Sequence, residues 1–297
     1  MGYESRANLT QNIVITGASS GLGRALALEY AAPNRVLGLL GRDERRLAEA
    51  AQRVRAKGAI AHTASIDVRD REGMRSFLVN FDMAAPIDLL IASAGVTMVT
   101  PAPGEVENLT KAQALFDINV GGVMNTLTPI APLMRSRRVG RIAVFGSIAA
   151  FAPPPDSPSY AASKAALVAF ALATRALYYA DGVSVSVVCP GFVETPMTAS
   201  FSSWKPLSMS AEEAAKRIRR GLDRRRAVIA FPLPLYLAAR LSRWLPDSLR
   251  IQAMLKYRAV ARAPSRCHPH ETGDPSAGRD ALDLRVRGAD KVGEGER

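Results

Sequence analysis

A tyrosine and a lysine four residues apart are the first pair of side chains in this sequence that could do chemistry. They are Tyr160 and Lys164, in an alanine-rich stretch, and a spacing of four places both on one face of a helix. A free phenol has a pKa of about 10, too high for proton exchange at neutral pH. A neighbouring ammonium group favours the phenolate, so the pair indicates a general acid or base.

A glycine-rich turn lies near the N-terminus, between an apolar run and a helical pattern. Asn12–Thr16 have the composition of a buried strand, and a helix is predicted over Leu22–Glu29. The glycines of the turn are Gly17, Gly21 and Gly23, and they let the backbone approach a pyrophosphate at the helix N-terminus. Taken alone, this pattern also fits an ordinary strand-to-helix turn.

Together the two patterns resemble the short-chain dehydrogenase/reductase family, whose marks are Thr-Gly-x-x-x-Gly-x-Gly and Tyr-x-x-x-Lys. Ser147 lies thirteen residues before Tyr160, as the catalytic serine of that family does, and Asn119 matches its catalytic asparagine. One motif differs from the family pattern: the usual Asn-Asn-Ala-Gly is replaced by Ala92-Ser93-Ala94-Gly95. We expect weaker bracing of the fourth strand there. The resemblance covers residues 13–197.

The resemblance implies hydride transfer between a nicotinamide and a carbonyl or secondary alcohol. Tyr160 would exchange the proton with the substrate oxygen, which Ser147 would hold and polarise. Lys164 would lower the pKa of the tyrosine and bind the ribose. Asn119 would position a water molecule for the proton relay.

The resemblance also implies a set of cofactor contacts. Asp67 and Val68 would hold the adenine, and Thr195 would contact the nicotinamide carboxamide. The full set is Gly17, Ser19, Ser20, Gly21, Leu22, Gly23, Arg42, Asp67, Val68, Ser93, Ala94, Gly95, Tyr160, Lys164, Pro190, Gly191, Val193 and Thr195.

The end of the second predicted strand bears on the choice between NAD and NADP. NAD sites usually place an acidic residue there, whereas NADP sites offer arginine to the 2′-phosphate. Here Gly41 stands at the acidic position and Arg42 follows it. Asp43 is better explained as the N-cap of a helix over Glu44–Lys57. We therefore expect NADP rather than NAD, the alternative being that Arg42 is a solvated surface arginine.

Strand-like runs alternate with helical patterns, which predicts an α/β protein with a doubly wound parallel sheet of the Rossmann type. We expect a single domain with a C-terminal helical extension. Residues 9–200 would form the dinucleotide-binding and catalytic core, 201–262 a substrate lid and basic extension, and 263–297 a disordered tail. The strand-like runs are Asn12–Thr16, Arg35–Leu40, Ala59–Ala64, Ile87–Ala92, Arg141–Phe145 and Val183–Cys189.

Cysteine content and the N-terminal sequence indicate a reducing, cytoplasmic compartment. The two cysteines, Cys189 and Cys267, do not suggest a disulfide framework. The N-terminus shows no signal-peptide pattern. The tail also contains His268 and His270, but so few ligands in a polar tail predict no metal site.

The segment that follows the family motifs is strongly basic. Residues 210–262 hold thirteen Lys and Arg against four acids, in a chain whose net charge is +12. Within it, Ala227–Ala239 are uncharged, and Leu237, Leu241 and Trp244 follow at helical spacing. Two interpretations remain open: a substrate lid with solvated arginines, and an interfacial segment on anionic lipid at the inner face of the membrane. Nucleic-acid binding is disfavoured, because no recognised module is present.

The substrate pocket and the assembly can also be anticipated. Met98, Phe151 and Phe192 fall near positions that line pockets in relatives, and the rigid loop 153–155 adjoins them, so we expect an apolar pocket. The helix predicted over Tyr160–Ala180 is apolar on nearly every side. Such a helix must be covered on both faces, which favours a homodimer or homotetramer.

These observations predict a cytoplasmic NADP(H)-dependent oxidoreductase acting on a lipophilic small molecule. One alternative is a non-catalytic nucleotide sensor of the same fold, which would have no need of an intact proton relay. Another is an epimerase or dehydratase of the longer branch of the family, whose glycine turn reads Gly-x-x-Gly-x-x-Gly, unlike the turn of this chain.

Overall fold

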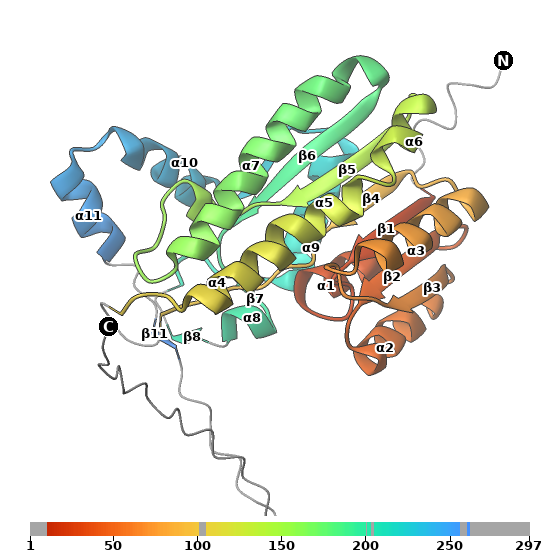
Figure 1. Ribbon diagram of the computed structural model, residues 1–297, viewed down its shortest axis with the longest axis horizontal. Coiled ribbons are helices and arrows are strands. Elements are labelled where there is room, and N and C mark those ends of the chain that lie inside the picture. Colours follow the sequence, from red (N-terminus) through yellow and green to blue (C-terminus); the bar gives the residue numbers. More distant parts are fainter. Residues whose placement is uncertain (1–10, 101–104, 200, 203–204, 256–259, 262–297) are drawn as a thin grey trace, which may run out of the picture. The chain divides into compact units, whose positions relative to one another are not determined.

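Seven parallel strands form the central sheet of the computed structural model (Figure 1). The structure describes residues 11–100, 105–199, 201–202, 205–255 and 260–261. The order across the sheet is β10-β6-β5-β4-β1-β2-β3. The strands are β1 (Asn12–Thr16), β2 (Val36–Gly41), β3 (Ile60–Ser65), β4 (Leu89–Ala92), β5 (Gly140–Phe145), β6 (Val183–Pro190) and β10 (Val228–Phe231).

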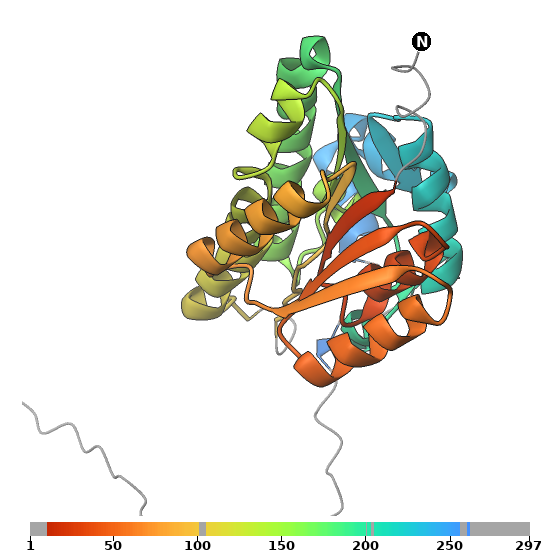
Figure 2. The same cartoon turned by 90° about the vertical axis from the view of Figure 1, so that its right-hand side faces the viewer.

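Helices cover both faces of the sheet, because successive strand residues point to opposite sides. On one face Ile13 and Ile15 pack with α1 (Gly21–Tyr30), α2 (Glu44–Arg55) and α9 (Ala211–Asp223). On the other face Val14 packs with the remaining large helices. These are α3 (Arg71–Ala84), α5 (Gly122–Leu127), α6 (Ala131–Ser136) and α7 (Pro158–Tyr178). Figure 2 shows the two helix layers on either side of the strands. This arrangement confirms the predicted doubly wound α/β fold.

The reversal of strand order next to β1 opens a crevice at the carboxyl ends of the strands. β1 pairs with β2 on one side and with β4 on the other. In sheets of this type ligands bind outside the carboxyl ends at such a switch point. The glycine turn and the residues after β3, β4, β5 and β6 all lie at this edge, so the fold brings the predicted site residues together.

The local signals for helix ends agree with the structure. Asp43 caps α2, and its carboxylate accepts a hydrogen bond of 2.9 Å from the Arg46 amide. Ser210 caps α9 in the same way through the Glu213 amide. Asp43 is therefore occupied as a helix cap, as its position before α2 predicted.

The seventh strand was missed by the sequence analysis. Val228–Phe231 pair in parallel with β6 as β10, although the uncharged run Ala227–Ala239 was assigned to an extension outside the sheet. The four-residue apolar run is buried at alternate positions, but it is too short for its period to be recognised. Part of the 201–262 segment is thus integral to the core.

Short elements complete the C-terminal region. They are β7 (Val193–Glu194), α8 (Pro196–Ala199), β8 (Phe201–Ser202), β9 (Met209–Ser210), α10 (Leu233–Leu241), the 3-10 turn η5 (Ser242–Trp244), α11 (Asp247–Leu255) and β11 (Val260–Ala261). The expected lid over 198–209 thus contains the end of α8 and two short strands. The predicted disorder of 263–297 and the Cys267 cluster lie outside the described residues.

Helix α7 leaves part of its apolar surface exposed. Leu167, Val168 and Ala171 are buried against the sheet, whereas Leu172 and Leu177 are exposed. By length and composition alone, Pro158–Asp181 would suffice to cross a bilayer. Since the helix also carries Tyr160 and Lys164 against the sheet, it is better described as a core helix with one uncovered apolar face.

Candidate active site

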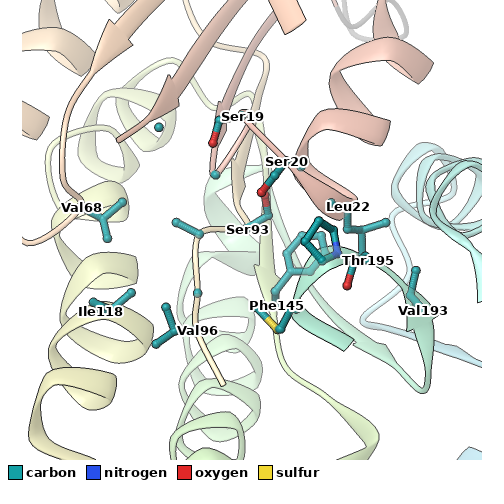
Figure 3. A pocket seen from close by; sticks show the side chains of 18 of the residues that line it. Ser19, Ser20, Leu22, Val68, Ser93, Val96, Ile118, Phe145, Val193 and Thr195 are labelled. Atoms are coloured by element: carbon teal, nitrogen blue, oxygen red, sulfur yellow. The ribbon is translucent and has the colours of Figure 1, made fainter. Parts of the chain in front are cut away.

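The first of two adjoining cavities has a volume of about 270 Å³ and lies over the glycine turn. Every residue that the sequence predicted to contact the cofactor lines it. Side chains from the turn, from the loops after β3 and β4, and Thr195 surround one space in Figure 3. Residues that the sequence analysis did not assign as contacts also contribute, namely Gly41, Ile66, Val96, Ile118, Phe145, Gly146, Pro196, Met197 and Thr198.

The glycines of the turn are required by their conformation and by close approach. Gly17 and Gly21 have positive φ angles of 71° and 52°, which L side chains rarely adopt. A Cβ on Gly17 would lie 2.9 Å from the Cα of Ala94, and one on Gly23 would collide with the carbonyl of Gly17. The turn therefore leaves bare backbone facing the cavity at the N-terminus of α1, as a bound pyrophosphate requires.

Ser93 braces the ends of β1 and β4, contrary to the expected weakening. Its hydroxyl donates a hydrogen bond of 2.5 Å to the carbonyl of Thr16. The Thr16 hydroxyl in turn accepts a bond from the Ala94 amide at 3.2 Å. Serine reaches the neighbouring strand directly, so replacement of the usual asparagine does not leave these strand ends unlinked.

Arg42 places a positive charge beside the first cavity. The Arg42 guanidinium is largely exposed and lies 3.8 Å from the Asp67 carboxylate. Asp67 also binds Arg69 at 2.8 Å, and this hydrogen bond lowers the pKa of its carboxyl. A Cβ on Gly41 would lie 3.0 Å from the Ser19 hydroxyl. An acidic side chain at position 41 would therefore crowd Ser19. Asp67 and Val68 follow β3 rather than end it.

Tyr160 and Lys164 line the first cavity, and Ser147 lies beside Tyr160 on the second. Tyr160 and Lys164 lie on α7, and Ser147 follows β5. The Lys164 ammonium is buried, lies 5.8 Å from the centre of the Tyr160 ring and donates a bond of 2.9 Å to the Phe145 carbonyl. The two side chains thus share a helix face, as the spacing predicted.

Burial dominates the electrostatics of this group. It raises the pKa of Tyr160, and a hydrogen bond with Ser147 offsets part of that rise. Burial also lowers the pKa of Lys164, to about 8. The role of Lys164 in lowering the pKa of Tyr160 stays a prediction.

Asn119 lies behind the cavity, in a π-helical segment η2 (Asp117–Gly121) between α4 (Leu109–Phe116) and α5. Its amide oxygen accepts from the Val96 amide at 2.8 Å. Its amide nitrogen donates to the Val96 carbonyl and to the Ser163 hydroxyl, both at 3.0 Å. Both amide hydrogens are used, so the side chain anchors the loop after β4 to α7.

The buried ammonium of Lys164 gives a measurable pH dependence. Between pH 8 and the ordinary value of 10.5, the unfolded chain retains a proton on this lysine that the folded chain has lost. The free energy of unfolding therefore rises with pH in this interval, by at most about 1.4 kcal/mol per pH unit. We expect this rise in the cofactor-free wild type relative to Lys164→Met in denaturant titrations. Lys111→Met, on the exposed side of α4, is the control; parallel curves for wild type and Lys164→Met would contradict the shift.

A second cavity of about 370 Å³ adjoins the first and is predominantly apolar. Ser147 and Tyr160 lie at its inner end. Of the three predicted lining residues only Phe192 lines it; Phe151 instead packs edge-on against Tyr236, with ring centres 5.3 Å apart. One wall of the cavity, which no sequence pattern predicted, is made by Leu235, Ala238 and Ala239 of α10 and by Arg250, Ala253 and Met254 of α11.

The described part of the chain contains no group of three or more His, Cys, Asp and Glu side chains that could hold a metal. Cys189 is buried as a free thiol, and burial raises its pKa to about 12. The polar side chains of the site carry hydroxyl, ammonium and amide groups, and they lie around two joined cavities, one with backbone suited to phosphate and one apolar.

Comparison with known proteins identifies the family. A family model described as short chain dehydrogenase matches residues 11–206. An uncharacterized oxidoreductase of Myxococcus xanthus is 31% identical over 240 residues, covering 80% of this chain and 93% of the relative. The 11-beta-hydroxysteroid dehydrogenase A of Sesamum indicum is 36% identical over 188 residues, covering 63% of this chain and 53% of that protein.

Solved structures agree with this assignment. A short-chain dehydrogenase from Sphingobium yanoikuyae in complex with NADPH aligns with a TM-score of 0.69 at 25% identity, covering 86% of this chain and 99% of that chain. A short-chain dehydrogenase/reductase from Burkholderia phymatum in complex with NAD gives a TM-score of 0.72 at 23% identity, covering 87% and 99%, and shares the fold. The chain belongs to the short-chain dehydrogenase/reductase family. It is an oxidoreductase of alcohol and carbonyl groups that uses a nicotinamide cofactor.

Proposed function

We propose that this enzyme is an NADP(H)-dependent carbonyl reductase or secondary-alcohol dehydrogenase for a lipophilic substrate. The observation that carries the proposal is the position of Tyr160, which lines both cavities. A phenol at this junction can reach a substrate in the apolar cavity and a cofactor in the other. A nicotinamide bound in the first cavity supplies or accepts the hydride.

Each polar side chain of the group has one assigned role. Tyr160 gives its proton to the carbonyl oxygen during reduction and takes it back during oxidation. Ser147 holds and polarises the same oxygen, and its bond to Tyr160 aligns the two hydroxyls. Lys164, which lines the first cavity and is held by the Phe145 carbonyl, binds the ribose of the cofactor. Asn119 fixes the loop that carries Val96 and thereby keeps the wall of that cavity in place.

The preference for NADP over NAD rests on charge at the far end of the first cavity. Arg42 can bind a 2′-phosphate through charge-assisted hydrogen bonds, and Ser19 lies beside the same space. An acidic residue that would bind ribose hydroxyls is replaced by Gly41. Two neighbours at 25% identity, the Sphingobium enzyme and L-sorbose reductase from Gluconobacter frateurii, are described with NADPH, which supports the proposal, while other neighbours are described with NAD.

Self-association and a cytoplasmic location complete the proposal. The exposed apolar face of α7 includes Leu172 and Leu177, and a second copy of the chain is the simplest cover for it, giving a homodimer or homotetramer. The buried free thiol of Cys189 suits a reducing compartment. Analytical ultracentrifugation of the full chain measures the assembly directly.

The apolar cavity leads to a testable substrate preference. Each methylene moved from water into an apolar site contributes about 0.8 kcal/mol. With NADPH, kcat/KM for a homologous series of methyl ketones should therefore rise about three- to fourfold per added methylene until the cavity is full. Steady-state rates on ketones of four to twelve carbons measure this. A flat series, or no reduction of any member, would reject a lipophilic carbonyl substrate.

A further inference from the structure

The C-terminal helices expose many large apolar side chains, and those of α10 form a row. Leu233, Leu237 and Leu241 of α10 recur every four residues and are exposed, so they lie along one side of the helix. Trp244 of η5 continues the row and is 88% exposed. Leu245, two residues before α11, and Leu249, Ile251 and Leu255 of α11 are also exposed, although Leu249 and Ile251 lie on different sides of that helix. Large apolar side chains concentrated in this way mark an interaction surface.

Covering the substrate cavity does not account for this face. Tyr236 and Ala239, on the opposite side of α10, are buried and pack with Ile148. Leu235 and Ala238 line the apolar cavity. The wall of the cavity is thus made by the inner sides of the helices and by Leu245, whereas Leu237, Leu241 and Trp244 line neither the first nor the second cavity.

The surroundings of the apolar face are basic. Arg240 and Arg243 lie on the same helical segment and are exposed. Between residues 224 and 255 the one acid is Asp247, and it is paired with Arg250 at 2.6 Å. Next to the first turn of α10, a cavity of about 330 Å³ contains Leu233 and Tyr236 together with Arg217, Arg220, Arg224 and Arg226.

We propose that α10, η5 and α11 form a docking face for an anionic membrane surface. The apolar row enters the boundary between headgroups and acyl chains, and the arginines bind anionic phospholipid headgroups. Because the inner sides of these helices line the substrate cavity, docking places the cavity beside the bilayer. Entry of a lipophilic substrate from the membrane would follow from this placement. That step of the inference rests on the proposed function.

Charge favours a membrane over a second copy of the chain as the occupant of this face. In a two-fold symmetric dimer the same patch meets itself, so Arg240 and Arg243 would approach the corresponding arginines of the other copy. Like charges across an interface oppose association. An anionic lipid surface has the opposite charge and matches both features of the face.

The test is co-sedimentation of the full chain with vesicles. We expect binding to phosphatidylcholine vesicles that contain 30% phosphatidylserine, weak binding to pure phosphatidylcholine, and loss of binding as salt is raised. Arg240→Glu/Arg243→Glu and Leu241→Glu/Trp244→Glu should each lower the partition coefficient more than tenfold. Matched controls are Arg53→Glu/Arg75→Glu and Met83→Glu, at exposed positions on α2 and α3, which should bind as the wild type does.

Insertion can be measured at Trp244 itself. The chain has two tryptophans, so Trp204→Phe leaves Trp244 as the single emitter. With anionic vesicles its fluorescence should shift to the blue and be quenched by brominated acyl chains. Failure of the wild type to bind anionic vesicles, or equal losses in test and control variants, would overturn the proposal. Dissociation of the homo-oligomer by Leu241→Glu/Trp244→Glu, without vesicle binding by the wild type, would assign the face to a second copy.

The docking proposal and the proposed reaction can be tested independently of each other. Tyr160→Phe should bind vesicles as the wild type does, because docking uses no proton transfer. Conversely, Leu241→Glu/Trp244→Glu should reduce a short water-soluble ketone at the wild-type rate, since neither residue lines the cavities beside Tyr160. With a long-chain ketone embedded in vesicles the same variant should be slower. Loss of vesicle binding in Tyr160→Phe would contradict a surface independent of the reaction.

Discussion

Replacement of Tyr160 by phenylalanine should lower kcat by about 10²- to 10⁴-fold, the usual contribution of a positioned general acid. The ring remains between the two cavities, so the packing of α7 and the shape of both cavities are kept. Only the hydroxyl is lost, and with it the bond to Ser147. The dissociation constant for NADPH, measured by fluorescence titration, should stay within about twofold of the wild type, because the glycine turn and Arg42 are unchanged.

The matched control is Tyr178→Phe, the same substitution near the other end of α7. Tyr178 packs under the Arg135 guanidinium at 4.8 Å and lines neither cavity beside Tyr160. This variant should keep the wild-type rate. More than a few per cent of wild-type kcat in Tyr160→Phe would show that another group supplies the proton.

Arg42→Asp should reverse the cofactor preference. Removing a charge-assisted hydrogen bond to a phosphate costs about 1.5 to 3 kcal/mol, and the new carboxylate also repels the 2′-phosphate while accepting bonds from ribose hydroxyls. The ratio of kcat/KM for NADPH to that for NADH should fall by at least about 100-fold, since 1.4 kcal/mol corresponds to a factor of ten.

Two further variants isolate the cause. Arg42→Gln removes the cation without adding an anion beside Asp67, so it should weaken NADPH but gain little with NADH. Arg45→Asp changes charge by the same amount one turn along α2, where the side chain is largely exposed and pairs with Glu49, and should leave the ratio unaltered. A wild type that already prefers NADH would mean that Gly41 and Arg42 have been misinterpreted.

Short sequence patterns predicted the strands and helix caps, whose structure depends mainly on residues that are neighbours in the chain. The six predicted strands are within two residues of those observed, because each is an apolar run bounded by a turn. All the cofactor contacts that the family resemblance implied line the first cavity, although nine further lining residues were not among them. Parallel strands bring the ends that carry these residues to one edge of the sheet. The position of Asp43 directly before a helix indicated that it is a helix cap and not an acid that binds ribose.

What the sequence did not reveal depends on contacts between distant segments. β10 is a strand because β6 lies beside it, and four apolar residues in an uncharged run carry too little signal. The wall of the apolar cavity requires α10 and α11 to fold back over the loop after β5. The charge state of Tyr160 depends on how deeply α7 is buried and on where Lys164 points, and neither can be read from a spacing of four.

The π-helical segment η2 has a consequence for how the site tolerates insertions and deletions. α4, η2 and α5 follow one another without a break, and the wider turn shifts the phase of α5 relative to α4. On one side of this shift Asn119 holds Val96. On the other, Asn125 of α5 donates to the Val68 carbonyl at 2.9 Å. Within η2 a one-residue deletion can be absorbed, because the wide turn returns to regular winding and α5 keeps nearly the same orientation. A one-residue deletion in α5 before Asn125 would instead rotate that side chain by about 100° away from Val68, and one loop of the cofactor cavity would lose its support although no residue that lines the cavity had been changed.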